Sequence, residues 1–86
     1  MELTQLRFFL AAAEHEGFSP AARQLYTSHS TLSRSVSALE EELGVQLFIR
    51  EHKRLSLTPA GEMLMEDAKK IISLADEATK RIKGLG

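Results

Sequence analysis

Cysteine and tryptophan are absent from this chain of 86 residues, and only two residues are proline. Without cysteine there is neither a disulfide framework nor a thiolate zinc site, which favours a reducing, cytoplasmic setting. The longest apolar run covers only residues 8–13, well short of the about 20 residues that a membrane-spanning helix needs. Acidic Glu2 stands where a secretory signal carries positive charge. We therefore expect no partnership with a membrane.

The small size of the chain argues against catalysis. Eighty-six residues fit one small domain, which rarely encloses a catalytic pocket. Ser33 and His29 superficially suggest a nucleophile and a base, but no orienting carboxylate accompanies them. The three histidines, at positions 15, 29 and 52, fall on different predicted elements, so a metal site is not expected. The sequence predicts a protein that is not an enzyme and needs no cofactor.

Charge is balanced in total but unevenly distributed. Eleven basic and twelve acidic side chains give a net charge of −1, whereas a nucleic-acid-binding domain is often clearly basic. Residues 17–39 contain no acid, although Arg23 and Arg34 are present, and residues 40–42 are then all glutamate. We interpret the glutamate block as a solvated helix end. The acid-free segment is the part of the chain best suited to face a polyanion.

Apolar spacing and capping residues predict the first three helices. Spacings of three and four indicate a helix over residues 4–14. Ser19-Pro20 is a helix start signal, with Ser19 as N-cap, and predicts a short helix over residues 20–26. A third helix should run over residues 29–43, between an N-cap serine and a C-cap glycine. Its predicted core face consists of Leu32, Val36, Leu39 and Leu43.

The remainder of the chain predicts a small sheet and a long helix. Two short strands within residues 47–57 are joined by a charged turn. Thr58-Pro59 then opens a helix of roughly 25 residues. The predicted fold is mainly α, with three helices and a two-stranded wing followed by a long helix. We expect one domain over 1–58, with the wing at 47–58, and the long helix over 59–86.

The second and third predicted helices have the residue pattern of a helix-turn-helix. Ala22 is small enough for one helix to cross the other, and Leu25 helps to lock them together. On the outward face of the third helix, Arg34 can bind guanine O6 and N7 or reach a phosphate, among short hydroxyls that let the backbone approach DNA. We therefore predict sequence-specific binding of double-stranded DNA, with residues 29–43 in the major groove. The expected contacts from this helix are Ser28, His29, Ser30, Thr31, Ser33, Arg34 and Ser37.

The final predicted helix carries a heptad pattern. Apolar residues alternate spacings of four and three through Leu64, Ala68, Ile71, Ala75, Ala78, Ile82 and Leu85. A mean period of 3.5 is typical of a coiled-coil seam, which predicts a homodimer through this helix. The alternative is a helix that lies back on its own domain. We favour the dimer because a helix of about 37 Å is too long for so small a domain to cover.

Six sequence blocks stand together in an order and at a spacing typical of one family. The blocks are LTQLRFF (3–9), GFSPAA (17–22), SHSTLSR (28–34), LEEELG (39–44), LFIR (47–50) and LTPAG (57–61). They resemble the DNA-binding domain of LysR-type bacterial transcriptional regulators, over essentially the whole chain. The family commonly has glutamine where His29 stands, and its third helix is often more basic than this one.

The resemblance implies a winged helix-turn-helix DNA-binding domain over 1–58, with the helix-turn-helix at 18–37 and the wing at 47–58, followed by a linker helix over 59–86 that dimerises. The wing, residues 50–54, would reach the adjacent minor groove or the backbone, through Arg50, Lys53 and Arg54. Two linker helices would pair antiparallel, and the dimer would bind a pseudo-palindromic operator. A small-molecule effector would be bound only through a larger domain that is missing here. We expect a cytoplasmic, nucleoid-associated protein. The alternative function is a winged-helix module used only for protein association, which the near-neutral charge permits.

Overall fold

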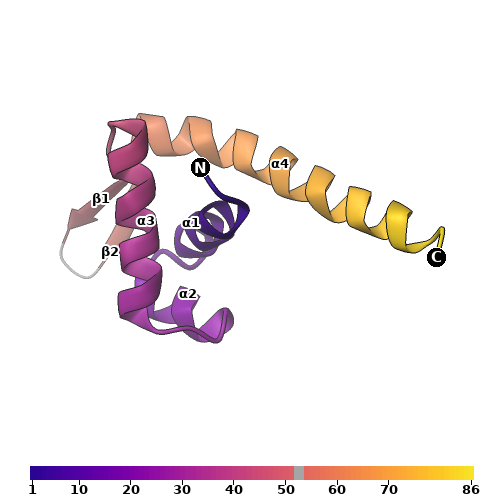
Figure 1. Cartoon of the computed structure of the whole chain (residues 1–86). Helices are drawn as coiled ribbons and strands as arrows, with labels where there is room; N and C mark the ends of the chain where they lie inside the picture. Colours follow the sequence, from indigo (N-terminus) through magenta and orange to yellow (C-terminus); the bar gives the residue numbers. More distant parts are fainter. Residues whose placement is uncertain (52–53) are drawn as a thin grey trace.

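The computed structural model describes residues 1–51 and 54–86. The elements in order are α1 (Leu3–His15), α2 (Phe18–Gln24), α3 (His29–Leu43), β1 (Phe48–Glu51), β2 (Arg54–Leu57) and α4 (Pro59–Lys83). The two strands form one antiparallel sheet. This confirms the predicted fold class, a mainly helical winged helix-turn-helix with a long final helix. In Figure 1, α4 crosses the body beside α1, and its C-terminal half projects away from the rest of the molecule.

The hydrophobic core lies where α1 meets α2, α3 and the wing. Phe9, Leu32 and Leu39 are completely buried, and each such side chain contributes about 1.5–3 kcal/mol on burial. The ring of Phe9 packs on that of Phe48, with centroids 5.3 Å apart. Because Leu55 on the opposite strand is also buried, the wing is fixed to the core on one face.

The start of α2 differs from the prediction. The helix begins at Phe18 with Gly17 as N-cap, so the prediction of Ser19 as N-cap is wrong. Pro20 is the third helical residue. Proline is tolerated there because the first-turn N–H groups of a helix have no intrahelical acceptor.

The helix also ends two residues before its predicted end. Its last residue is Gln24, and Tyr26 adopts a left-handed φ of 54°. The N–H of Thr27 then donates to the carbonyl of Ala22 at 2.9 Å, which closes the turn between α2 and α3. Tyr26 is 97% exposed. Leu25, which we expected to lock α2 to α3, is half-buried and packs against the hydrophobic core.

Both ends of α3 are capped as predicted. The Oγ atom of Ser28 accepts a hydrogen bond from the N–H of Thr31 at 3.0 Å. Gly44 ends the helix in the left-handed region at φ 71°, a conformation that glycine adopts without steric cost. The predicted core face is wrong at its last position, because Leu43 is 41% exposed. It lies in the final turn, next to the glycine cap.

The glutamate block at the end of α3 is not uniformly solvated, contrary to the prediction. The side chain of Glu40 is only 14% exposed. One of its oxygens, Oε2, accepts hydrogen bonds from the N–H groups of Leu47 at 2.7 Å and Phe48 at 3.4 Å. Glu41 and Glu42 are exposed. Glu40 thus ties the end of α3 to the first strand of the wing.

The first half of α4 belongs to the core of the domain. Thr58 caps the helix by accepting from the N–H of Gly61 at 3.0 Å. Gly61 and Ala68 are buried, and four larger side chains of the helix pack against the core: Leu64, Met65, Ile71 and Ile72. The core therefore continues past the predicted boundary between residues 58 and 59.

An ion pair lies beyond this packed segment. Arg7 on α1 donates to the carboxylate of Asp76 on α4 at 2.8 Å, and both side chains are about half exposed. The hydrogen bond from Arg7 lowers the pKa of Asp76, with a smaller contribution from the nearby charge of Lys80. Farther along, α4 points away from the body (Figure 1).

Candidate nucleic-acid interface

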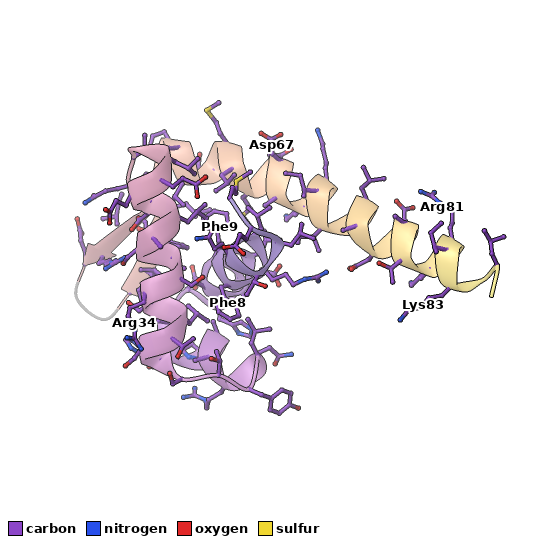
Figure 2. The ribbon with its side chains drawn as sticks, in the orientation of Figure 1. Phe8, Phe9, Arg34, Asp67, Arg81 and Lys83 are labelled. Carbon is purple, nitrogen blue, oxygen red and sulfur yellow. The ribbon has the colours of Figure 1, made fainter. Side chains whose placement is uncertain are left out.

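The outward face of α3 presents the side chains that the sequence singled out. His29, Ser30, Thr31, Arg34 and Ser37 are exposed, and Ser33 is half-buried. Figure 2 shows Arg34 on the side of α3 that faces away from α1 and α4. No element covers this face among the described residues, so it is open to a ligand that fits along a helix.

Arg34 is held loosely along its own helix. Its Nε–H donates to the carbonyl of Ser30 at 3.4 Å, a long contact. Within residues 1–51 and 54–86, no carboxylate pairs with Arg34. The absence of acidic residues from 17 to 39 explains this, since the neighbouring turns supply hydroxyls instead. The guanidinium therefore keeps most of its five donors for a ligand.

Ser28 and Thr31 have structural roles at the start of α3. Besides capping the helix, the hydroxyl of Ser28 donates to Oγ1 of Thr31 at 2.8 Å. These two hydroxyls fix one another's orientation at the end of the helix that Figure 1 shows next to α2.

The wing places two arginines beside the start of α2. Arg50 on β1 donates to Oε1 of Glu40 at 3.3 Å, and its guanidinium carbon lies 5.0 Å from the centre of the Phe18 ring. Arg54 on β2 lies 3.6 Å from a carboxylate oxygen of Glu16, and both of these side chains are exposed. Lys53, the third predicted contact from the wing, lies outside the described residues.

Phe18 joins the wing to the start of α3. Its ring meets that of His29 edge-on at 5.7 Å between centroids, and that of Phe48 edge-on at 6.0 Å. No specific role was predicted for Phe18 or Glu40 from the sequence. The role of Glu40 could not be recognised from its neighbours in the sequence, because the two N–H groups and the arginine that it binds come from the wing.

A hollow of 290 Å³ lies between the start of α2, the start of α3 and the wing. The three basic side chains at its wall, His29, Arg50 and Arg54, come from three different elements. Among the described residues, no acidic side chain lines it. Its lining residues are Gly17, Phe18, Ser19, Pro20, His29, Arg50, Arg54 and Leu55. The hollow continues the outward face of α3 toward the wing with a basic wall.

The predicted dimer residues on α4 fall into different environments. Ala68 is completely buried in the core of its own chain, so its assignment to a dimer surface is wrong. Ile82 and Leu85 are 68% and 84% exposed. The remaining four are half-buried: Leu64, Ile71, Ala75 and Ala78. Only part of the heptad pattern is thus available to a partner.

Two exposed apolar side chains of α4 lie outside the predicted dimer pattern. Leu74 and Met63 are 59% and 73% exposed. Leu74 lies three residues after Ile71 and four before Ala78, so it shares a face with them. Between Ile71 and Ala78 the predicted pattern used the half-buried Ala75 in place of its exposed neighbour Leu74.

Other kinds of site find no support in the described part of the chain. No three His, Cys, Asp or Glu side chains gather there in a way that could hold a metal ion. No helix there is long and apolar enough to cross a membrane.

Comparison with known proteins identifies the family. Residues 3–62 match the family described as bacterial regulatory helix-turn-helix protein, lysR family. This chain belongs to the lysR family. It is 44% identical over 85 residues to the HTH-type transcriptional regulator BudR of Klebsiella aerogenes, covering 99% of this chain and 59% of BudR. It is 37% identical over 81 residues to the HTH-type transcriptional regulator TfdT of Cupriavidus pinatubonensis (strain JMP 134 / LMG 1197), covering 94% of this chain and 36% of TfdT.

A solved structure of a lysR-family domain has the same fold. The crystal structure of the CbnR DNA-binding domain in complex with DNA superposes with a TM-score of 0.93 at 39% identity, covering 99% of this chain and 98% of that chain. Over its length, this chain therefore corresponds to the DNA-binding domain of a LysR-type transcriptional regulator. It spans about a third of the length of TfdT.

Proposed function

We propose that this chain binds double-stranded DNA sequence-specifically, as a homodimer, with α3 in the major groove and the wing at the adjacent minor groove or backbone. The observation that carries the proposal is the outward face of α3, where exposed hydroxyls surround Arg34 and residues 29–39 contain no acid. In the CbnR domain, the same fold is crystallised in complex with DNA.

The proposed DNA contacts from α3 are the predicted ones. Arg34 would read a guanine through O6 and N7 or bind a phosphate. The hydroxyls of the exposed serines would bind phosphates or base edges, and His29 would donate from its ring. The set from α3 is Ser28, His29, Ser30, Thr31, Ser33, Arg34 and Ser37, and that from the wing is Arg50, Lys53 and Arg54.

The proposed dimer contact uses the exposed apolar face of α4. Leu74 and Ile82 lie on α4 and Leu85 follows its last residue, and all three side chains are exposed. Two copies of this helix packed antiparallel would cover these side chains and place two copies of α3 on a pseudo-palindromic site, because two-fold symmetry in the protein is matched by the operator.

The wider role belongs to the whole regulator. Regulation of transcription in the cytoplasm, at the nucleoid, follows from the family and is part of this proposal. Recognition of a small-molecule effector would require a domain outside these 86 residues.

Fluorescence anisotropy with a labelled duplex of mixed sequence, titrated with protein at several salt concentrations, tests the proposal. We expect the logarithm of the binding constant to fall linearly with the logarithm of salt concentration, because each phosphate contact releases condensed counterions. Operator selection from a random pool would then define the sequence preference. A chain that sediments as a dimer but binds no duplex at low salt would instead favour a role in protein association.

A further inference from the structure

We propose that Glu40 is a positioning residue for DNA binding, which holds the guanidinium of Arg50 over the ring of Phe18 so that it binds one backbone phosphate. The inference rests on the proposed function and assigns a role to an acidic side chain near the DNA-facing surface. By charge alone, such an acid should weaken the binding of a polyanion.

The geometry fixes Arg50 from two sides. Its Nη2 donates to Oε1 of Glu40 at 3.3 Å, and its guanidinium carbon lies 5.0 Å from the centre of the Phe18 ring. A planar guanidinium can stack on an aromatic face and pair with a carboxylate at once. Its side chain nevertheless remains 47% exposed, so donors are left for a third partner.

Glu40 is itself held in place. Its Oε2 accepts from the N–H of Leu47 at 2.7 Å and from that of Phe48 at 3.4 Å, and its side chain is only 14% exposed. The two oxygens thus have separate tasks: one binds the backbone of the wing, and the other binds Arg50. A carboxylate anchored in this way can orient an arginine, whereas one on a mobile surface side chain contributes little.

The surroundings of Arg50 suit a phosphate. Arg50 lies in the wall of the hollow that His29 and Arg54 also line. On its other side it borders a second hollow with Ser37 and Glu40. Arg50 therefore lies beside the outward face of α3, at the place where the backbone next to a helix-filled major groove would pass. Phosphate is the expected ligand because a planar guanidinium binds its oxygens through two parallel hydrogen bonds.

The substitution Glu40→Gln separates the two tasks of the carboxylate. The amide oxygen can still accept from the N–H of Leu47, but the amide nitrogen cannot accept from Arg50. We expect DNA affinity to fall about three- to tenfold, as for the loss of one oriented charge-assisted contact. The slope of the logarithm of affinity against the logarithm of salt should become shallower by about 0.9, the value of one phosphate contact.

The matched control is Glu41→Gln. It removes the same charge one residue away, from an exposed side chain. We expect unchanged or slightly tighter binding for this variant. Arg50→Ala should make the salt dependence of affinity shallower by the same amount as Glu40→Gln. Adding Glu40→Gln to Arg50→Ala should cause no further loss of DNA affinity, because Glu40 acts through Arg50.

Arg50→Lys tests the proposal independently of any effect of Glu40 on folding. It keeps the charge but loses the planar group that stacks and pairs, so it should bind more weakly than the wild type. Wild-type affinity in Arg50→Lys, or unchanged or tighter binding in Glu40→Gln, overturns the inference while leaving the proposed function intact. Absence of salt-dependent binding by the wild-type chain overturns both.

Discussion

Gly61 provides a sharp test of how α4 is fixed to the wing. In the interior of an exposed helix, replacing glycine by alanine stabilises a protein by about 1 kcal/mol. A Cβ atom at position 61 would instead meet the carbonyl oxygen of Leu47 inside contact distance, and it would lie 2.9 Å from Cδ2 of Leu57. The sign of the effect should therefore be reversed for Gly61→Ala.

The size of the destabilisation depends on which atoms can move to relieve the clash. The carbonyl of Leu47 accepts from the N–H of Thr58 at 3.0 Å, and Thr58 also caps α4. The obstructing atom is thus backbone that is hydrogen-bonded to the start of the same helix, so relief requires α4 to shift. Overpacking of this kind costs about 1–3 kcal/mol, and we expect a net loss of that order for Gly61→Ala.

Urea unfolding followed by circular dichroism measures the effect. Protein concentration must be held constant, because dimerisation links stability to concentration. Ser73→Ala, at an exposed position of the same helix, serves as control and should change stability by less than about 0.5 kcal/mol. Equal or higher stability of Gly61→Ala would refute the close approach of α4 to the wing.

Four further predictions concern the two interfaces and the local contacts. Arg34→Ala should weaken operator binding by about 1–3 kcal/mol and relax specificity at one base pair, as measured by anisotropy; equal affinity for the operator would refute its role. Leu74→Glu should dissociate the dimer in sedimentation at micromolar concentration, whereas Ser73→Glu, on the adjacent exposed position, should not; an unchanged sedimentation coefficient for Leu74→Glu would contradict the proposed dimer face. Ser28→Ala should lower the free energy of unfolding by about 0.5–2 kcal/mol, because the N-cap of α3 is lost; a variant as stable as the wild type would contradict the cap. The arginine partner of Asp76 holds the pKa of this carboxyl below its usual value of 3.8, so the stabilisation is present above about pH 4 and is lost as the pH falls through the lowered pKa. The urea midpoints of the wild type and Asp76→Asn should accordingly converge as the pH is lowered. A difference in midpoint that stays constant with pH would show that the ion pair does not cause it.

Local signals in the sequence were sufficient for most of the helix ends. Ser28, Gly44 and Thr58 act within a few residues of their own position, so their roles as caps can be recognised without the fold. The prediction of Ser19 as an N-cap also relied on a local signal, and there it was wrong. Serine before proline is a common start signal, but the packing of Phe18 against the wing and α3 extends the helix by two residues.

The outward face of α3 was also determined by the sequence alone. A helix with apolar residues at spacings of three and four has its opposite face in solvent, and here that face contains hydroxyls and Arg34. Lack of acid from residues 17 to 39 is a property of composition, and no tertiary contact is needed to see it.

Tertiary structure decided which surfaces of α4 remain open. The heptad pattern treats Ala68 and Ile82 alike, but Ala68 is buried in the core of its own chain whereas Ile82 is 68% exposed. A periodic pattern shows which side of a helix is apolar. Whether that side is covered by its own domain or left exposed depends on how far the domain extends along the helix. Glu40 illustrates the same point for a charge: one of three adjacent glutamates is held by the wing, because only its side chain points toward β1. Short-range physics thus set the elements and the outward face of α3, while contacts between residues distant in the chain set the roles of Glu40, Gly61 and Ala68.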